Sequence, residues 1–293
     1  DSLSANTTGD YNVALGSGAL QDNTTADSNT AVGFRSLFEN LTGHSNVAMG
    51  DSGLRNNTTG NSNVGLGFSA LSANTTGPDN TAVGKECLKD NTTGQQNAAL
   101  GTLAGSTVTT GQDNVLIGYL AGAHNVGLTT GVNNILIGSY ADITAADSNG
   151  ANVIGYDVSG AAGYTTLGKA GDDIRAAHGN VTWATVSDER VKKDITDSEA
   201  GLSFINDLRP VTFNFKNKGD LPKEFKGYEK GSDEVYKNSN VNHGFIAQEV
   251  KEAIDNHPEI ADGFSMWDVR ETGQQEVGET AVIPVLVKAI QEL

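Results

Sequence analysis

The segment with the most chemical potential begins at Ser187 and reads Ser-Asp-Glu-Arg-Val-Lys-Lys. A serine hydroxyl becomes an effective nucleophile only when a neighbouring base takes its proton. A lysine amine can be that base only where desolvation lowers its pKa. The same residues also suit the start of a helix, with Ser187 as the N-cap and with Asp188 and Glu189 favourable to the helix dipole. On this segment alone, the helix cap is the preferred interpretation.

Other kinds of chemistry are poorly represented in the chain. The five histidines show no spacing typical of metal ligands, and Cys87 is the single cysteine. We therefore expect no metal site, no cofactor and no disulfide framework. A formal net charge of −17 argues against a nucleic-acid partner. No apolar run approaches the roughly 18 residues that a membrane span needs, so we expect no membrane insertion.

The chain of 293 residues changes sharply in composition near residue 186. Charged residues number 21 among the first 186 and 34 among the last 107, and four of the five prolines follow residue 209. This change predicts a domain boundary. We expect a repeat region at 1–155, a transition with one last degenerate strand at 156–186, and a second domain at 187–293.

A strict repeat runs through the first region. A tetrad such as Val-Ala-Leu-Gly follows Asn12 and recurs every 17 residues as far as Asn114, then after 20 residues at Asn134 and after 18 at Asn152. An Asn-Thr-Thr-Gly marker and a leucine series that starts at Leu20 keep the same period. One unit cannot bury its own apolar face, but stacked units can. The repeat therefore predicts a mainly β, solenoid-like region.

Alternation within each tetrad predicts the two faces of a short strand. The Leu15 position is always large and apolar, so we expect it in the core. The Ala14 position stays small until Leu116, which indicates that a backbone or another chain packs closely there. Gly16 and its equivalents suit a positive φ or a close approach. The Asn12 series fits a stacked amide ladder or simple turn formation equally well.

These repeats resemble the head domains of trimeric autotransporter adhesins, whose Asn-x-Val-Ala-Ile-Gly strands form a parallel β-roll, and the repeats of phage tail fibres. The resemblance covers roughly residues 4–155 and departs in unit length, because the adhesin unit is shorter. It implies a trimeric parallel β-roll. The small Ala14 face is what a chain packed around a three-fold axis would need.

In the second domain, the spacing of apolar residues predicts a strand at 211–215 and a helical stripe from Ala247 to Ile254. It also predicts an apolar stripe from Ile283 to Leu293 that is suited to packing against partner chains. Its four sequence blocks cover 187–195, 208–215, 243–250 and 283–293. In their order and spacing they resemble the C-terminal intramolecular chaperone of phage tail spikes and fibres, of the self-cleaving endosialidase type. We therefore expect a smaller α+β chaperone domain.

That second resemblance implies self-cleavage between Val186 and Ser187 after assembly, with Ser187 as the nucleophile and Lys192 as the general base. Positions five apart lie about 140° around a helix and on opposite faces of a strand. A turn, or Lys192 from a neighbouring chain, must therefore bring the pair together. Residues expected to support assembly or cleavage are Asp188, Gln248 and Glu249.

These features predict the distal part of a trimeric phage tail fibre or tail spike, located on the virion and used in host-cell attachment. The chaperone would drive trimer assembly and then cut itself off as a single-turnover serine peptidase. Expected partners are further copies of the chain, a host cell-surface receptor such as a glycan or an outer-membrane component, and the rest of the tail fibre or the baseplate. Alternatives are a bacterial surface adhesin or appendage with the same modules, and a polysaccharide depolymerase, although the acids of the repeats recur in no consistent position.

Overall fold

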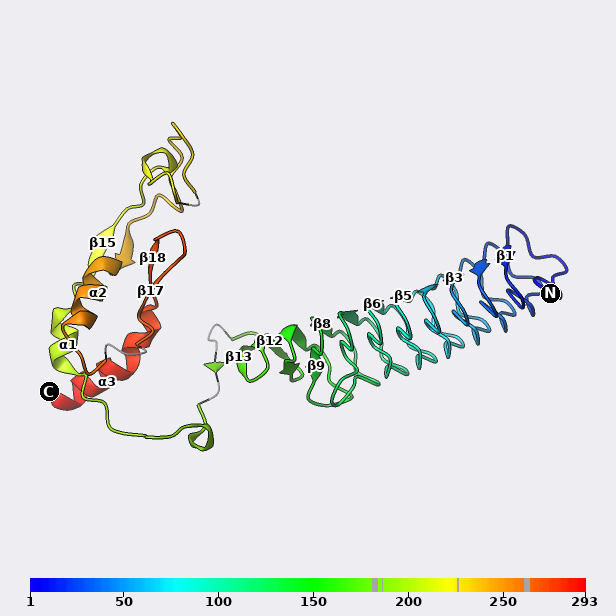
Figure 1. Ribbon diagram of the computed structural model, residues 1–293, viewed down its shortest axis with the longest axis horizontal. Helices are drawn as coiled ribbons and strands as arrows, with labels where there is room; N and C mark the ends of the chain where they lie inside the picture. The colour runs from blue at the N-terminus through cyan, green and yellow to red at the C-terminus, as the bar shows by residue number, and fades with distance from the viewer. Residues whose placement is uncertain (181–183, 186, 226, 261–263) are drawn as a thin grey trace. The chain divides into compact units, whose positions relative to one another are not determined.

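The computed structural model describes residues 1–180, 184–185, 187–225, 227–260 and 264–293. The chain forms two compact units, Asp1–Asp188 and Glu189–Leu293 (Figure 1). The first unit is a β-solenoid of about nine turns, and the second is a small domain of few helices and short strands. The predicted fold class, a mainly β repeat region followed by a smaller α+β domain, is confirmed.

Each coil of the solenoid contributes one short strand to a continuous parallel sheet. The strands stack in register, so that Ala14 lies opposite Ala31 and Ala31 lies opposite Ala48. In sheet order they are β1 (Val13–Leu15), β2 (Thr30–Val32), β3 (Val47–Met49), β4 (Val64–Leu66), β5 (Thr81–Val83), β6 (Ala98–Leu100), β7 (Val115–Ile117), β8 (Ile135–Ile137), β10 (Asn152–Tyr156) and β12 (Tyr164–Lys169).

The far end of the solenoid closes with antiparallel pairing. β13 (Asp172–Ala177) folds back on β12, and β14 (Ala184–Thr185) pairs with β13. A second, two-stranded sheet joins β9 (Asp142–Ile143) to β11 (Ser159–Gly160). The degenerate strand expected in the transition segment is β12, which continues the parallel sheet from β10.

Asparagine side chains bind each coil to the next through the interior. The Nδ2 group of Asn63 donates to Oδ1 of Asn46 at 3.2 Å and to the carbonyl of Gly77 at 2.9 Å. Its Oδ1 accepts the backbone N–H of Asn80 at 2.9 Å. The asparagines at this position are fully buried from Asn29 to Asn134, apart from 1% exposure at Asn97. Of the two interpretations left open for this series, the stacked ladder is correct.

A second ladder uses the asparagine of the Asn-Thr-Thr-Gly turns. The Nδ2 group of Asn57 donates to Oδ1 of Asn40 at 2.8 Å and to the carbonyl of Gly60 in its own turn at 2.9 Å. These residues therefore form the turn and join neighbouring coils at the same time. The first ladder ends one coil earlier than the sequence spacing suggested, because Ala151 occupies the next position and Asn152 pairs with Ile135 instead.

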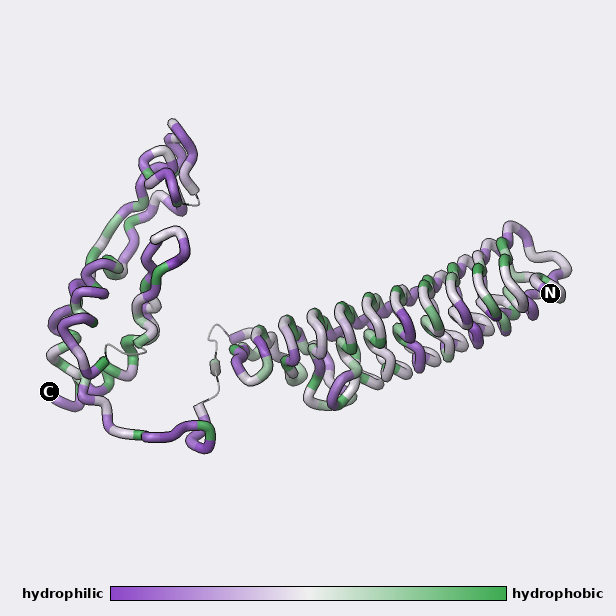
Figure 2. Tube along the Cα trace, in the orientation of Figure 1, coloured by the Kyte–Doolittle hydropathy of each residue, from purple (hydrophilic) through white to green (hydrophobic). Residues whose placement is uncertain are grey.

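The two faces of the strands are the reverse of the prediction. Ala31, Ala48 and Ala82 are fully buried, whereas Leu15 is 68% exposed and Leu100 is 51% exposed. The small position points into the coil and belongs to the same buried cluster as the leucine series. Figure 2 shows hydrophobic residues that recur from coil to coil along the solenoid. The expectation that the Leu15 position forms the core is therefore wrong. Of the two neighbours expected at the Ala14 position, a backbone is correct, because an added Cβ at Gly65 would lie 3.2 Å from the carbonyl oxygen of Ala70, and another chain is wrong.

The narrow interior of the coil explains this reversal. At Gly65, which occupies the small position, an added Cβ would lie 3.3 Å from Cγ of Leu54. A side chain larger than alanine would therefore overpack most coils. The bend after each strand is equally tight: Gly50 has a φ of 127°, and an added Cβ would lie 2.5 Å from the carbonyl oxygen of Gly67. The expected need for glycine at this position is confirmed.

In its described residues, the second unit packs three helices and two pairs of antiparallel strands around a small core. Phe204, Val250, Ile254, Met266 and Val285 belong to this core. Its elements are the 3₁₀ turn Glu189–Val191, α1 (Leu202–Asp207), β15 (Val211–Phe213), the 3₁₀ turn Lys218–Asp220, β16 (Asn242–Gly244), α2 (Ala247–Asp255), β17 (Trp267–Val269), β18 (Gln275–Val277), the 3₁₀ turn Glu279–Val282 and α3 (Ile283–Glu292). β15 pairs with β16, and β17 pairs with β18, both antiparallel.

Replacing one ladder asparagine should destabilise the solenoid strongly. Asn63→Ala removes the four hydrogen bonds of the amide side chain and leaves the buried backbone N–H of Asn80 without an acceptor. A lost hydrogen bond costs about 1 kcal/mol, and an unsatisfied buried group costs about 1–3 kcal/mol. We expect the free energy of unfolding to fall by about 3 kcal/mol or more in urea denaturation. Thr59→Ala, at an exposed turn position, is the control and should change it by less than about 0.5 kcal/mol. Equal stability of the two variants would contradict the ladder.

Candidate functional site

The junction of the two units contains the predicted nucleophile. Ser187 is exposed and is followed by the 3₁₀ turn Glu189–Val191, which the backbone N–H of Lys192 continues by donating to the carbonyl of Glu189 at 3.0 Å. Residues 187–200 form no α-helix. The helix that Ser187 was expected to cap on local grounds is therefore replaced by a single short turn.

The predicted dyad spans the boundary between the units. Ser187 belongs to the first unit and Lys192 to the second, and both residues are exposed. Asp188, named as a supporting residue, is exposed beside them. Val186, on the other side of the predicted cut, lies outside the described residues. The pairing of Ser187 with Lys192 stays a prediction.

The chain after the junction is extended and open to solvent. Residues 187–199 are all exposed, including two apolar side chains, Val191 at 69% and Ile195 at 62%. A peptide bond can be cut only where the chain can leave regular structure and be reached, and exposed connecting segments meet that condition. The geometry of this segment suits a cleavage site.

An arginine–carboxylate pair joins two of the sequence blocks in the second unit. Arg209 Nε donates to Oε2 of Glu249 at 3.0 Å, and its second nitrogen donates to Oε1 of the same carboxylate. This two-point contact raises the pKa of Arg209 and lowers the pKa of Glu249 through hydrogen bonding. Glu249, predicted as a supporting residue, therefore holds the start of α2 beside the strand β15.

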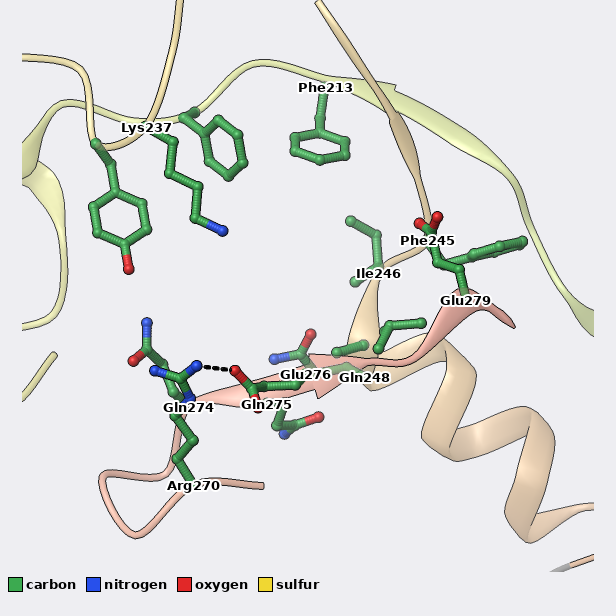
Figure 3. A pocket seen from close by; sticks show the side chains of 14 residues that line it. Phe213, Lys237, Phe245, Ile246, Gln248, Arg270, Gln274, Gln275, Glu276 and Glu279 are labelled. Carbon is green, nitrogen blue, oxygen red and sulfur yellow. Dashed lines mark ion pairs between the residues drawn. The ribbon is translucent and has the colours of Figure 1, made fainter. Parts of the chain in front are cut away.

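Gln248, the other predicted supporting residue, lines a cleft of about 590 Å³ (Figure 3). One wall carries Phe213 and Lys237, and the opposite wall carries Arg270 and Glu276 from the β17–β18 hairpin. The first residues of α2, including Gln248, lie between the two walls. An ion pair joins Arg270 to Glu276, and Lys237 Nζ lies 5.2 Å from the centre of the Phe215 ring.

The cleft has the chemistry of a binding surface. Its lining is aromatic, carboxamide and charged, and the described lining residues include no serine, threonine, cysteine or histidine. Aromatic faces and carboxamides together suit an extended polypeptide, whose side chains and backbone amides they can contact. Gln248 lines this cleft, and its support of assembly or cleavage stays a prediction.

His257 joins the end of α2 to α1. Its Nε2 lies 2.9 Å from Oδ2 of Asp207, and its Nδ1 lies 2.7 Å from Oε1 of Glu259. Its ring contacts Phe204 edge-on at 5.4 Å, and only 9% of the residue is exposed. The hydrogen bond to Asp207, followed by that to Glu259, raises the pKa of the imidazole. Its role here is to join structural elements.

Sequence reasoning missed both of these contacts. Arg209 and Glu249 stand in two of the blocks that identified the domain, but 40 positions separate them. Asp207 and His257 are 50 positions apart and have no motif spacing. For Arg209 and Glu249, a charged residue in each block was the available signal, whereas Asp207 and His257 lie outside the blocks and gave none.

Two searches of the described residues add no further site. No cluster of three or more histidine, cysteine or acidic side chains is arranged to hold a metal ion in the described part of the chain. Among the same residues, none of the helices has both the length and the apolar character of a membrane span.

Comparison with known families gives one match. Residues 187–257 match the model of a peptidase family described as the chaperone of endosialidase. The match begins at Ser187, at the junction, and ends at His257, after α2. No curated protein and no solved structure matches the chain. The resemblance of the C-terminal region to an intramolecular chaperone that follows a repeat region is thereby confirmed.

The stability of the second unit should depend on pH through His257. A raised histidine pKa gives stability that is fully present below the unfolded value of about 6.5 and is lost as pH rises through the folded value. We expect His257→Gln to lower the urea midpoint at about pH 6 and to lower it much less at about pH 9. Tryptophan fluorescence, to which Trp267 contributes, gives the measurement. The exposed His243→Gln is the control, and an equal effect of His257→Gln at both pH values would contradict the assignment.

Proposed function

We propose that this chain is the distal part of a trimeric phage tail fibre or tail spike, in which the solenoid serves host attachment and the second unit is a self-releasing assembly chaperone. The observation that carries the proposal is the start of the family match at Ser187, on the exposed junction between the two units. A match confined to the core of the second unit would support only a folding domain.

The outward face of the strands supports association of the solenoids. Alternate strand residues form an exposed apolar stripe from coil to coil, among them Met49 at 46%, Leu100 at 51% and Ile154 at 43% exposure. Contiguous exposed apolar surface of this kind marks an interaction site. The stripe runs from β1 to β10, which suits an interface between parallel copies. The number of three copies comes from the family resemblance.

The last helix supports association of the second units. Val285 and Ala289 of α3 face the core, whereas Leu286 at 39%, Val287 at 51% and Ile290 at 69% are exposed. The predicted stripe at Ile283, Leu286, Ile290 and Leu293 has the three- and four-residue spacing of a helix–helix seam. Packing of this face against equivalent helices would bury it.

Assembly also explains how the junction could become reactive. A lysine amine acts as a base only when it is shielded from water, and Lys192 is exposed in the single chain. Contacts with neighbouring chains would supply that shielding. Release of the chaperone would then follow trimer formation and not precede it.

Cleavage can be tested with freshly expressed protein, denaturing electrophoresis and intact-mass measurement. Wild type should give one fragment that ends at Val186 and one that starts at Ser187. Ser187→Ala removes the nucleophile and should leave the chain intact. Lys192→Ala removes the proposed base and should slow the cut about 10²–10⁴-fold.

The adjacent Lys193→Ala is the matched control and should be cut at nearly the wild-type rate. Continued cleavage of Ser187→Ala at the same bond would exclude Ser187 as the nucleophile. A wild-type trimer that is never cut would make the second unit a retained chaperone.

Trimer formation can be tested separately by light scattering. Uncleaved Ser187→Ala protein should have about three times the chain mass of 30.4 kDa. Leu100→Glu places a charge in the apolar stripe and should lower that mass or cause aggregation, because an unpaired charge is costly to bury. Thr93→Glu, at an exposed turn position of the same coil, should remain trimeric. A monomeric Ser187→Ala protein would exclude the assembly that we propose.

A further inference from the structure

An aromatic cluster occupies the last regular coils of the solenoid. Tyr119, Tyr140 and Tyr156 stack along three successive coils, with ring centres 5.3 and 5.8 Å apart and near-perpendicular planes. The His124 ring lies 4.5 Å from that of Tyr140, and its Nε2 lies 3.8 Å from Oδ1 of Asp157. Tyr119 is 42% exposed and Tyr156 is 51% exposed, so the cluster faces solvent.

The one lengthened coil builds this cluster. The coil between Asn114 and Asn134 has 20 residues instead of 17, yet these two side chains keep the ladder contact at 3.0 Å. The additional length leaves the coil as a loop closed by a hydrogen bond from Leu128 N–H to the carbonyl of Gly122 at 2.9 Å. His124 lies in this loop and reaches Tyr140 of the next coil.

A buried carboxylate fixes the loop. Oδ2 of Asp142, which is fully buried, accepts the backbone N–H groups of Asn125, Val126 and Gly127 at 2.7, 3.0 and 3.4 Å. Three donors around one oxygen hold the loop in a single conformation. The backbone next to His124 is therefore held in place before any ligand arrives, which lowers the entropic cost of binding.

We propose that this cluster, defined as Tyr119, His124, Tyr140, Tyr156 and Asp157, binds a neutral glycan. Exposed tyrosine faces can stack against the C–H faces of a pyranose ring, while phenol, imidazole and carboxylate groups can bond to its hydroxyls. This inference rests on the proposed attachment function and names the chemistry of the receptor.

Charge selects the class of glycan. The first 186 residues carry 15 acidic and 6 basic side chains, and Asp157 lies within the cluster itself. Sialylated or sulfated glycans would be repelled by this field. The aromatic residues at the same position of earlier coils differ, because Phe34 and Phe68 lack a hydroxyl and each has a cation beside its ring: Arg35 lies 5.0 Å from the Phe34 ring and Lys85 lies 6.0 Å from the Phe68 ring.

The test uses the full chain on an array that carries neutral hexose oligosaccharides beside sialylated and sulfated ones. Wild type should bind neutral members, and Tyr119→Ala or Tyr156→Ala should weaken that binding about threefold to tenfold, as loss of one aromatic contact implies. Phe34→Ala, at the same position of an earlier coil, is the matched control and should bind like wild type.

Each other result overturns the proposal. Binding of anionic glycans only, or of no neutral glycan, would exclude the ligand class. Tyrosine variants that bind like wild type would exclude the site. Loss of the wild-type oligomeric mass in these variants would make the cluster a contact between chains. Binding of labelled protein to host cells separates the two proposals. If the tyrosine variants bind cells as well as wild type does, the attachment function stands and this site is rejected. If wild type does not bind cells, the attachment function itself is rejected.

Discussion

Hydrogen bonding between buried asparagine amides is the interaction on which the solenoid depends. Each asparagine amide must bond to the asparagine amide of the adjacent coil, so every coil has to bring its asparagine to the same place around the solenoid axis. This requirement fixes the period at 17 residues far more strictly than apolar packing could, because buried amide groups are costly to leave unpaired. It also explains how a longer coil is tolerated: Asn114 and Asn134 keep their contact, and the additional residues form a loop outside the core.

The repeat, its strands and its glycine bends were predictable from the sequence, but the direction of the strand faces was not. Alternation indicates that Ala48 and Met49 point to opposite sides, and it does not say which side is inside. The usual assumption that the larger apolar residue is buried failed because the leucine series already fills the coil. The space that the leucine series leaves inside the coil decides which face is buried.

In the second unit, local patterns were again sufficient for the elements and insufficient for the site. The strand at β15 and the helices α2 and α3 follow from apolar spacing. The contact between Arg209 and Glu249 does not, because it joins residues 40 positions apart. Ser187 and Lys192 are close in sequence but belong to different units. Where assembly brings catalytic groups together, one chain and its sequence contain only part of the geometry.

The near-identity of the coils has a consequence for how copies of the chain can align. Two solenoids that meet through their strand faces could shift by one coil, about 4.8 Å, and still present almost the same side chains to each other. Such a shifted pair would lose only the contacts of one terminal coil. The repeat therefore determines the shape of one solenoid well but determines the register between two solenoids poorly. In the assembly that we propose, a non-repeating domain at one end of the solenoid would remove that degeneracy, and it would no longer be needed once the strands had paired in register.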